Sequence, residues 1–173
     1  MGARAIVLIG LRRSGKSTVG RALAAALQMP FTDLDTEVER LEGRSIADIL
    51  VQEGEPAFRK KESEALAQVV TGAACVLATG GGTPLAEPNR RRLTAFGTVV
   101  YLRVSATALV ARLADDPDPD SRPVLRGSDG IDEVRLLLAE RDPSYVGFAD
   151  VVVDGHGDPD EVVGRCRVAL DAV

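Results

Sequence analysis

The sequence predicts an α/β protein: a doubly wound, five-stranded parallel sheet with helices on both faces. Short apolar runs alternate along the chain with segments of helical periodicity. These runs are continuous rather than interrupted by polar residues, which favours a parallel sheet buried on both faces. The length of 173 residues fits one domain, and no internal repeat or linker stands out. We therefore expect a single domain over residues 1–173.

Five apolar runs have the length and composition of buried strands. They cover residues 5–9, 30–34, 75–78, 98–104 and 151–153. Aromatic residues make up only 3% of the chain, so the core between sheet and helices must be aliphatic. In sheets of this kind ligands bind beyond the C-terminal ends of the strands. The segments that follow the strands are therefore the places to look for a site.

Helical spacing of apolar residues marks the segments between the strands. Helices are predicted after Gly15, from Ser45, after Gly54, and over residues 106–113, 131–141 and 159–170. In the first of these, Val19 and Leu23 share one face. Ser45 is followed three residues later by Asp48, a partial capping box. Pro159 stands at the start of the last helix, where proline is well tolerated.

Composition excludes several classes of site. The chain has one histidine, His156, and two cysteines, which rules out a site of several histidines or a zinc site of four cysteines. Any histidine-based triad must use His156. The net charge of −5 lacks the positive footprint of a nucleic-acid-binding protein, so we expect no nucleic-acid partner. Arginine nevertheless outnumbers lysine 18 to 3, which codon usage or anion binding would explain equally well.

No segment is predicted to enter a membrane. Residues 5–9, the longest apolar run near the start, are too short for a signal-peptide core or a membrane span. Cys75 and Cys166 form no disulfide framework and are interpreted as buried small residues. We expect a cytoplasmic protein without a membrane partner. We also expect a monomer, because no long apolar surface or heptad pattern stands out.

Residues 10–17, G-L-R-R-S-G-K-S, match the phosphate-loop pattern G-x-x-x-x-G-K-[ST] between a predicted strand and a predicted helix. Gly15 lets the backbone approach a phosphate, and the helix dipole behind it favours an anion. Lys16 places charge on the β- and γ-phosphates, and Ser17 offers a hydroxyl to Mg²⁺. The alternative is a glycine-rich turn that matches by chance. The loop, residues 10–18, indicates a nucleoside triphosphate, with contacts expected from Arg12, Arg13, Ser14, Gly15, Lys16, Ser17 and Thr18.

Two acidic residues, Asp33 and Asp35, end the second predicted strand. Strand alternation puts both on the same side, at the edge of the sheet where ligands bind. One carboxylate could hold Mg²⁺ through water, and the other could accept a proton from a substrate hydroxyl or orient it. On position alone they could equally be solvated loop acids or an N-cap for the following helix.

With these segments in view, the sequence resembles the shikimate kinase family. Residues 43–49 and 54–62 look like its signature G-x-S-I-x-x-I and G-E-x-x-F-R-x-x-E. Residues 78–82 (A-T-G-G-G) are similar to its glycine turn, 121–125 (S-R-P-V-L) to its R-P-x-L lid, and 140–145 (E-R-D-P-S-Y) to its E-R-x-x-x-Y segment. The motifs follow the family's order from residue 6 to about 170, so the resemblance covers nearly the whole chain.

The resemblance implies transfer of the γ-phosphoryl group of ATP to the 3-hydroxyl of shikimate. It also implies the strand order 2-3-1-4-5, a substrate-binding region over about residues 33–62 and a mobile lid over about residues 115–128. Asp33 then holds Mg²⁺ through water together with Ser17, and Asp35 contacts the shikimate hydroxyls as the base or orienting residue. Lys16, Asp35 and Arg122 form the catalytic set.

The same resemblance assigns the remaining site residues. Arg59 and Arg141 hold the shikimate carboxylate, and Glu62 anchors these arginines. Gly80, Gly81 and Gly82 contact the substrate through their backbone. Arg122 moves in with the lid to the phosphates. Arg112 lies against adenine, together with the loop 154–159 that ends at Pro159.

Several of these residues also have a plain structural interpretation. Arg59 could be a solvated helix residue, Arg141 a cation that interacts with a helix dipole, and Arg122 a partner of Asp120. His156 is expected to be solvated and not catalytic. Two positions depart from the family pattern: Arg13 stands where a small residue is usual, and Gly147 stands where a glutamate is common.

Two other functions compete with this one. A related kinase, such as one acting on gluconate, would share the phosphate loop and lid but lack the F-R-x-x-E and G-G-G segments. A non-catalytic nucleotide-binding module would have lost Lys16, Asp35 or Arg122, and all three are present.

Overall fold

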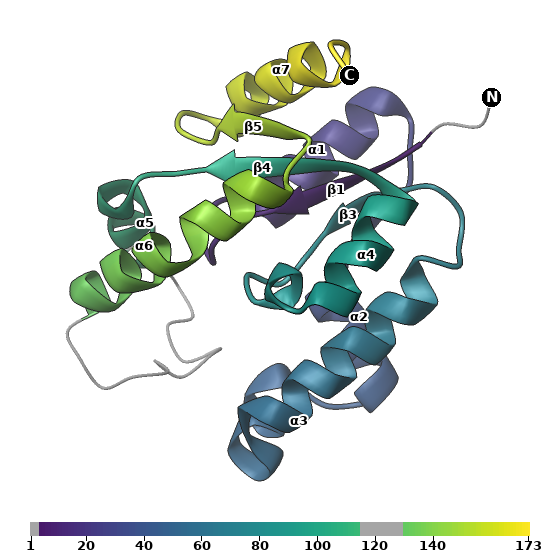
Figure 1. The fold of residues 1–173 in the computed structure, drawn as a ribbon, viewed down its shortest axis with the longest axis vertical. Coiled ribbons are helices and arrows are strands. Elements are labelled where there is room, and N and C mark those ends of the chain that lie inside the picture. The colour runs from purple at the N-terminus through teal and green to yellow at the C-terminus, as the bar shows by residue number, and fades with distance from the viewer. Residues whose placement is uncertain (1–3, 115–129) are drawn as a thin grey trace.

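The computed structural model describes residues 4–114 and 130–173. Within them the strands form one parallel sheet in the order β2-β3-β1-β4-β5 (Figure 1). Their bounds are β1 Ala5–Ile9, β2 Phe31–Asp33, β3 Val76–Ala78, β4 Gly97–Arg103 and β5 Val151–Asp154. The fold class and the strand order implied by the family resemblance are both confirmed.

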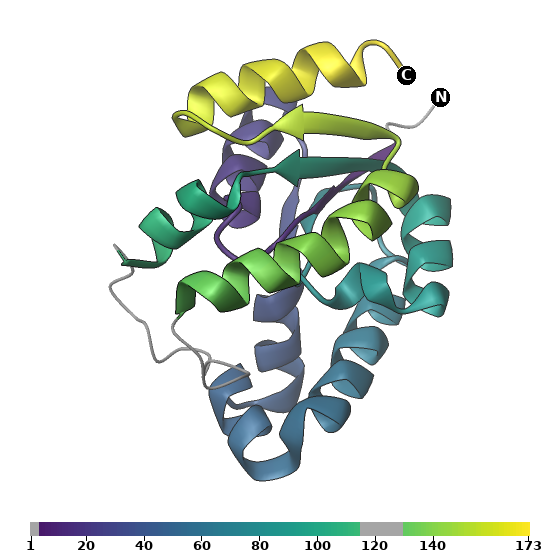
Figure 2. The same cartoon turned by 60° about the vertical axis from the view of Figure 1, so that its left-hand side comes forward.

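Helices cover both faces of the sheet (Figure 2). They are α1 Lys16–Leu27, α2 Leu34–Glu42, α3 Ile46–Val69, the short 3-10 helix η1 Thr83–Leu85, α4 Glu87–Phe96, α5 Ala106–Ala114, α6 Gly130–Phe148 and α7 Pro159–Leu170. Leu8 of β1 packs with Leu23 of α1 and Val162 of α7 on one face. Ile9 points to the opposite core, which includes Phe58 of α3. Alternate side chains of β1 thus pack into two aliphatic cores, one on each face of the sheet.

The helices from Ser45 and after Gly54 are confirmed as two segments that meet at a bend. The Ser45 hydroxyl accepts a hydrogen bond from the Asp48 amide, as the partial capping box predicts. Gly54 has φ 81° and ψ 172°, which interrupts the helical backbone of α3. Glycine tolerates this positive φ without steric penalty, and Pro56 then begins the second segment with its pre-set φ.

Several elements differ from the sequence-based expectation, among them α2 and η1, for which no bounds were predicted. The second strand ends at Asp33 rather than residue 34, because Leu34 already begins α2. Helix α4 was not predicted: it buries only Asn89 and Leu93 and so lacks an apolar stripe. Helix α6 continues past residue 141 to Phe148, through Pro143. Packing of Tyr145 in the core outweighs the local tendency of proline to end a helix.

Both cysteines are buried and reduced, as expected for small core residues. Burial raises the pKa of Cys75 and raises that of Cys166 to about 11, so both stay as thiols at neutral pH. Among residues 4–114 and 130–173, no helix combines the length and apolar character that crossing a membrane requires.

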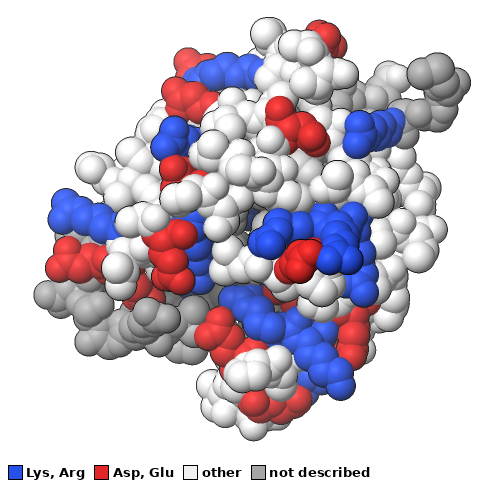
Figure 3. Space-filling model, viewed as in Figure 1, with Lys and Arg blue, Asp and Glu red and all other residues white. Residues whose placement is uncertain are grey.

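Charged side chains of both signs intermingle on the face that carries α3, α4 and α6 (Figure 3). Many of them are paired. Arg91 binds Glu87 along α4, and Lys61 of α3 reaches Glu42 of α2 at 2.6 Å. The exposed pair of Arg91 with Glu87 contributes little stability. Other arginines of α4 bind uncharged oxygens instead: Arg90 donates to the carbonyl oxygens of Pro84 and Leu85.

Candidate active site

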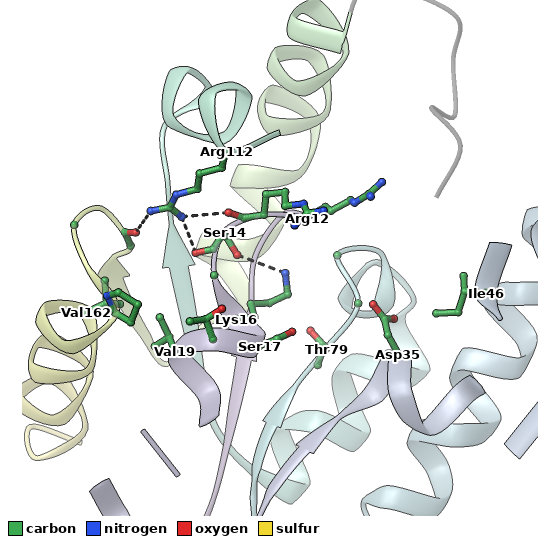
Figure 4. Close-up of a pocket in the computed structure, with 18 of the residues that line it drawn as sticks. Arg12, Ser14, Lys16, Ser17, Val19, Asp35, Ile46, Thr79, Arg112 and Val162 are labelled. Carbon is green, nitrogen blue, oxygen red and sulfur yellow. Dashed lines mark hydrogen bonds between the residues drawn. The ribbon is translucent and has the colours of Figure 1, made fainter. Parts of the chain in front are cut away.

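The phosphate loop wraps the start of α1, between β1 and the helix. Gly15 has φ 97° and serves as the N-cap, and Gly10 has φ 149° where the chain leaves the strand. Both glycines occur where an L side chain would be strained. The Lys16 ammonium donates hydrogen bonds to the carbonyl oxygens of Gly10 and Leu11, at 2.9 and 2.8 Å. The loop thus curls around its own lysine, as Figure 4 shows.

Arg13 is a distinctive residue of this loop. Its φ of 65° lies in the left-handed region. Glycine adopts this conformation without steric penalty, whereas other residues are destabilised there by about 1–2 kcal/mol. The departure from the small residue usual in the family is therefore a strained one. Backbone strain of this kind clusters at functional sites, where the surrounding contacts maintain it.

Arg112 of α5 ties two loops together. Its Nη1 donates to the carbonyl oxygens of Arg13 and Ser14, both at 3.2 Å, and its Nη2 donates to the Gly155 carbonyl at 2.9 Å (Figure 4). The phosphate loop and the β5–α7 loop are thereby held side by side. Only a planar fork of several donors can serve three carbonyls in this way.

One cavity of about 560 Å³ gathers the residues expected to contact nucleotide. Its lining includes Arg12, Arg13, Ser14, Gly15, Lys16, Ser17, Thr18, Arg112 and Pro159. Asp35, Gly80 and Gly81 line it as well. In Figure 4, Arg112 and Val162 lie at one end of the cavity and Asp35 with Ile46 at the other, with Ser17 and Thr79 between them.

Asp33 and Asp35 reach the site in a different way from the one expected. Asp33 ends β2 and caps α2: its Oδ1 accepts a hydrogen bond from the Asp35 amide at 3.0 Å. Asp35 is therefore in the first turn of a helix, so strand alternation does not place it. The other carboxylate oxygen of Asp33 accepts a hydrogen bond of 2.5 Å from the Ser17 hydroxyl. The interpretation of Asp33 as an N-cap is confirmed, and its second oxygen lies beside Ser17.

A second cluster forms where α3 meets the glycine turn after β3. Arg59 donates through Nη1 to Glu62 at 3.0 Å and through Nη2 to Glu55 at 3.1 Å. Glu62 is 1% exposed and also accepts a hydrogen bond of 2.7 Å from Thr83. Burial alone would lower the pKa of Arg59, but the two carboxylates raise it above its usual value, so Arg59 stays charged.

The glycine turn is shaped by this cluster. A Cβ at Gly82 would stand 2.6 Å from Nη2 of Arg59, and a Cβ at Gly80 would overlap the Glu62 carboxylate and stand 3.2 Å from Oδ1 of Asp35. The missing side chains of both glycines therefore leave room for the arginine and its anchor. This packing role is independent of any ligand.

Helix α6 brings Arg141 and Tyr145 to the same cluster. Tyr145 is buried and donates its hydroxyl hydrogen bond to the Gly81 carbonyl. Burial raises the pKa of Tyr145, although Arg141 and Arg59 nearby oppose the rise. Nε of Arg141 is buried without a hydrogen-bond partner in the described part of the chain. Arg59 of α3 and Arg141 of α6, from helices distant in sequence, therefore both lie near Tyr145.

The structure also shows residues that the motifs left without a role. No sequence pattern indicated a role for Thr83 or Asp142, because each makes its contact with a residue distant in sequence. Asp142 accepts hydrogen bonds from the Tyr101 hydroxyl at 2.7 Å and from Arg103 at 2.9 and 2.7 Å, which fastens α6 to the end of β4. Arg122 and the expected lid, residues 115–128, lie outside the described residues.

Comparisons with known proteins decide the family. A family model described as shikimate kinase matches residues 12–171. Shikimate kinase of Cereibacter sphaeroides is 40% identical over 167 residues, which is 96% of this chain and 82% of that protein. Shikimate kinase 2 of Sodalis glossinidius is 44% identical over 158 residues, 91% of this chain and 90% of that protein.

The chain belongs to the shikimate kinase family.

Solved structures agree with this membership. Shikimate kinase of Acinetobacter baumannii in complex with shikimate has a TM-score of 0.89 and 34% identity, over 98% of this chain and 94% of that one. The enzyme of Aquifex aeolicus has a TM-score of 0.83 and 36% identity, over 97% and 96%. A gluconokinase of Sinorhizobium meliloti reaches 0.55 at 20% identity, over 98% and 95%, a likeness of fold alone. The chain is thus a kinase of this family rather than a gluconate kinase.

Proposed function

We propose that this protein transfers the γ-phosphoryl group of ATP to the 3-hydroxyl of shikimate, giving shikimate 3-phosphate and ADP in aromatic amino-acid (chorismate) biosynthesis. One observation carries the proposal. The phosphate loop and the Arg59–Glu62 cluster lie at the same end of one sheet, with Asp35 between them. A nucleotide and a small carboxylic acid bound there would meet at Asp35.

The nucleotide binds in the cavity of the phosphate loop. Amides of the loop and Lys16 receive the phosphates, since successive backbone N–H groups at a helix start favour anions. Lys16 exchanges its carbonyl partners in the loop for the β- and γ-phosphates. Arg112 and Pro159 flank the adenine at the other end of the cavity.

Ser17 and Asp33 would hold Mg²⁺. The donor set fits this ion: a hydroxyl and a carboxylate oxygen, 2.5 Å from each other, are hard ligands of the kind that Mg²⁺ takes alongside water and phosphate. When bound, the ion neutralises charge on the phosphates. Asp33 itself is kept in place by its second oxygen, which caps α2.

Shikimate binds on the Asp35 side. Arg59 and Arg141 grip its carboxylate, because a planar guanidinium pairs with a carboxylate through two parallel hydrogen bonds. The buried Nε of Arg141 supports this assignment. Backbone groups of Gly80, Gly81 and Gly82 approach the ring, and Glu62 fixes the direction of Arg59.

In the transfer step the 3-hydroxyl oxygen forms a bond to the γ-phosphorus while the bond from that phosphorus to the β-bridging oxygen breaks, releasing ADP. The hydroxyl proton passes to the Asp35 carboxylate; alternatively, Asp35 accepts a hydrogen bond that orients the hydroxyl oxygen in line, and the proton passes to an oxygen of the transferred phosphoryl group. Arg122, carried by the lid over residues 115–128, then adds a cation beside the phosphates. Closure excludes water, which would otherwise hydrolyse ATP.

The organisation of the chain follows from this assignment. A single domain over residues 1–173 contains the phosphate loop 10–18, the substrate-binding region 33–62 and the lid 115–128. We infer a monomer that acts in the cytoplasm, since one chain supplies the site residues found within 4–114 and 130–173 and both cysteines are free thiols. Size-exclusion chromatography with light scattering checks the monomer: a mass of twice 18.3 kDa would contradict it.

The direct test is ADP release in a coupled assay with ATP, Mg²⁺ and one acceptor at a time: shikimate, quinate or gluconate. Shikimate should give the highest kcat/KM: all three acceptors offer a carboxylate to Arg59 and Arg141, so the ring must discriminate. The cyclohexene ring of shikimate is flatter than the saturated ring of quinate, and gluconate has no ring to lie against the glycine turn. Turnover with gluconate but not shikimate would support the related sugar-acid kinase. ATP binding without turnover on any acceptor would support a regulatory module.

A further inference from the structure

Asp142 of α6 directly follows Arg141 in the sequence and is fastened to the end of β4. Its Oδ1 accepts hydrogen bonds from the Tyr101 hydroxyl at 2.7 Å and from Nε of Arg103 at 2.9 Å. Its Oδ2 accepts a third hydrogen bond from Nη2 of Arg103, at 2.7 Å. A carboxylate that is gripped through both oxygens has a fixed place and a fixed direction. The turn of α6 beside Arg141 is therefore tied to the sheet.

Arg141 depends on its helix for its own position. Its Nε is buried and has no hydrogen-bond partner in the described part of the chain. Arg59, by contrast, is held by the carboxylates of Glu62 and Glu55 at 3.0 and 3.1 Å. Because Nε of Arg141 has no such partner among the described residues, the direction of the guanidinium follows from the position of α6.

Two contacts on different faces of α6 set its rotation about its own axis. Tyr145 lies one turn beyond Arg141, on the same face, and donates its hydroxyl hydrogen bond to the Gly81 carbonyl. Asp142 lies about 100° around the helix from Arg141, since a turn takes 3.6 residues. A helix that is held on one face alone can roll about its axis, whereas contacts on two faces prevent this motion.

Pro143 separates the two contacts along the helix. Proline has no N–H, so α6 lacks the backbone hydrogen bond to the carbonyl oxygen of residue 139 at this point. A helix bends most easily where such a bond is missing. Tyr145 lies beyond the proline and Arg141 before it. The Tyr145 contact alone therefore does not fix the turn that carries Arg141, and Asp142 is the residue placed to do so.

We propose that Asp142 is a positioning residue for shikimate, which holds α6 so that the Arg141 guanidinium meets the substrate carboxylate. The inference rests on the proposed function, because it takes Arg141 as a ligand of that carboxylate. Asp142 lines a separate groove together with Arg103 rather than the cavity that contains Asp35 and the phosphate loop. It therefore acts through Arg141 and not by touching the substrate.

The two residues that bind Asp142 keep their protons. Burial raises the pKa of Tyr101, and the hydrogen bond to Asp142 raises it further, so the phenol remains a donor. The same carboxylate raises the pKa of Arg103, chiefly through its hydrogen bonds. Arg103 is 57% exposed, so its ion pair with Asp142 contributes little to stability. A variant that keeps an acceptor for Tyr101 should consequently fold normally.

The test measures kcat and the KM values for shikimate and ATP in wild type, Asp142→Ala and Asp142→Asn. Asp142→Ala should raise the KM for shikimate about tenfold, because a misplaced guanidinium grips the carboxylate poorly. Asp142→Asn should raise it about threefold, since its amide oxygen still accepts the Tyr101 hydroxyl but the fork of Arg103 is lost. The kcat and the KM for ATP should be kept, as expected when binding remote from the reacting atoms is weakened.

A double-mutant cycle with Arg141→Ala separates positioning from a merely structural role. If Asp142 acts through Arg141, its removal should change nothing further once Arg141 is absent. The double variant should then have the shikimate KM of Arg141→Ala. Asp132→Ala is the matched control: Asp132 is an exposed acid of the same helix and pairs only along it, with Arg135 at 3.6 Å. Its loss should leave both KM values unchanged.

An unchanged KM for shikimate in Asp142→Ala would overturn the proposal, and so would losses that multiply in the double variant. Urea denaturation checks that each variant is folded, and Asp142→Asn decides the matter if Asp142→Ala does not fold. Should wild type bind shikimate without phosphorylating it, the proposed reaction alone fails, and the role of Asp142 is judged from the calorimetric Kd for shikimate. A wild type that does not bind shikimate would overturn both.

Discussion

The hydroxyl of Tyr145 on α6 donates a hydrogen bond to the carbonyl oxygen of Gly81, in the turn that follows β3. The two residues are 64 positions apart in sequence. Tyr145 is fully buried and stacks at a tilt of 55° on Tyr101 of β4. This one contact joins the helix that carries Arg141 to the turn that faces the proposed substrate.

Tyr145→Phe should therefore weaken substrate binding without touching the nucleotide site. The Gly81 carbonyl loses its donor, which should lower the free energy of unfolding by about 1–2 kcal/mol. The KM for shikimate should rise several-fold while the KM for ATP stays unchanged. Steady-state kinetics with each substrate varied, plus urea denaturation, measure both. An equal rise in both KM values would show that α6 stabilises the fold as a whole rather than the shikimate site in particular.

Glu62→Gln should disorder Arg59. The amide keeps the Thr83 hydrogen bond but removes the charge that holds the guanidinium, so the KM for shikimate should rise by about tenfold, equivalent to roughly 1.4 kcal/mol. Glu55→Gln is the matched control, since Glu55 binds the same arginine from an exposed position and should change KM less than about threefold. Equal effects of the two variants would refute the anchoring role of Glu62.

Gly82→Ala should displace Arg59. The added methyl would lie 2.6 Å from Nη2, so the guanidinium must move and the KM for shikimate should rise at unchanged KM for ATP. Gly164→Ala provides the comparison, because a methyl there on α7 meets nothing within 4 Å. It should leave kinetics intact and stabilise the helix by about 0.5–1 kcal/mol. Unaltered shikimate kinetics in Gly82→Ala would mean that Arg59 does not touch the substrate.

Arg112→Lys should loosen the nucleotide cavity. A single ammonium cannot reach three carbonyl oxygens on two loops, so ATP should bind about tenfold more weakly while the KM for shikimate is kept. Calorimetric titration with ADP and with ATP measures the change directly. Wild-type affinity in this variant would show that the two loops hold their positions without the arginine.

Asp35→Asn should lower kcat by about 10²–10⁴-fold, the usual contribution of a positioned base, and leave ATP binding nearly intact. The change is isosteric. The backbone N–H of residue 35 can still donate to the Asp33 carboxylate, so the cap of α2 is preserved. Circular dichroism verifies the fold of the variant. An unchanged kcat would remove Asp35 from the reaction.

Local patterns determined much of this site. β1, the phosphate loop and α1 occur where the sequence predicts them, because a continuous apolar run, two glycines and an apolar helix face are features of adjacent residues. The capping of α3 by Ser45 is equally local. In contrast, α4 buries little apolar surface, and the extension of α6 through Pro143 depends on packing of Tyr145 against β4. Neither helix boundary can be predicted from a short window of sequence.

By itself, then, the sequence determined the α/β class, the triphosphate-binding loop and, through its motifs, the family and the residue types of the site. Only the tertiary structure decided how those residues meet across elements: Asp33 on Ser17, Glu62 on Thr83, and Tyr145 on Gly81. The physical reason is that backbone conformation and capping are set by neighbours along the chain. A buried ion pair or a long-range hydrogen bond exists only once the sheet has brought separate segments together, because burial supplies the low dielectric and the fixed geometry that make it strong.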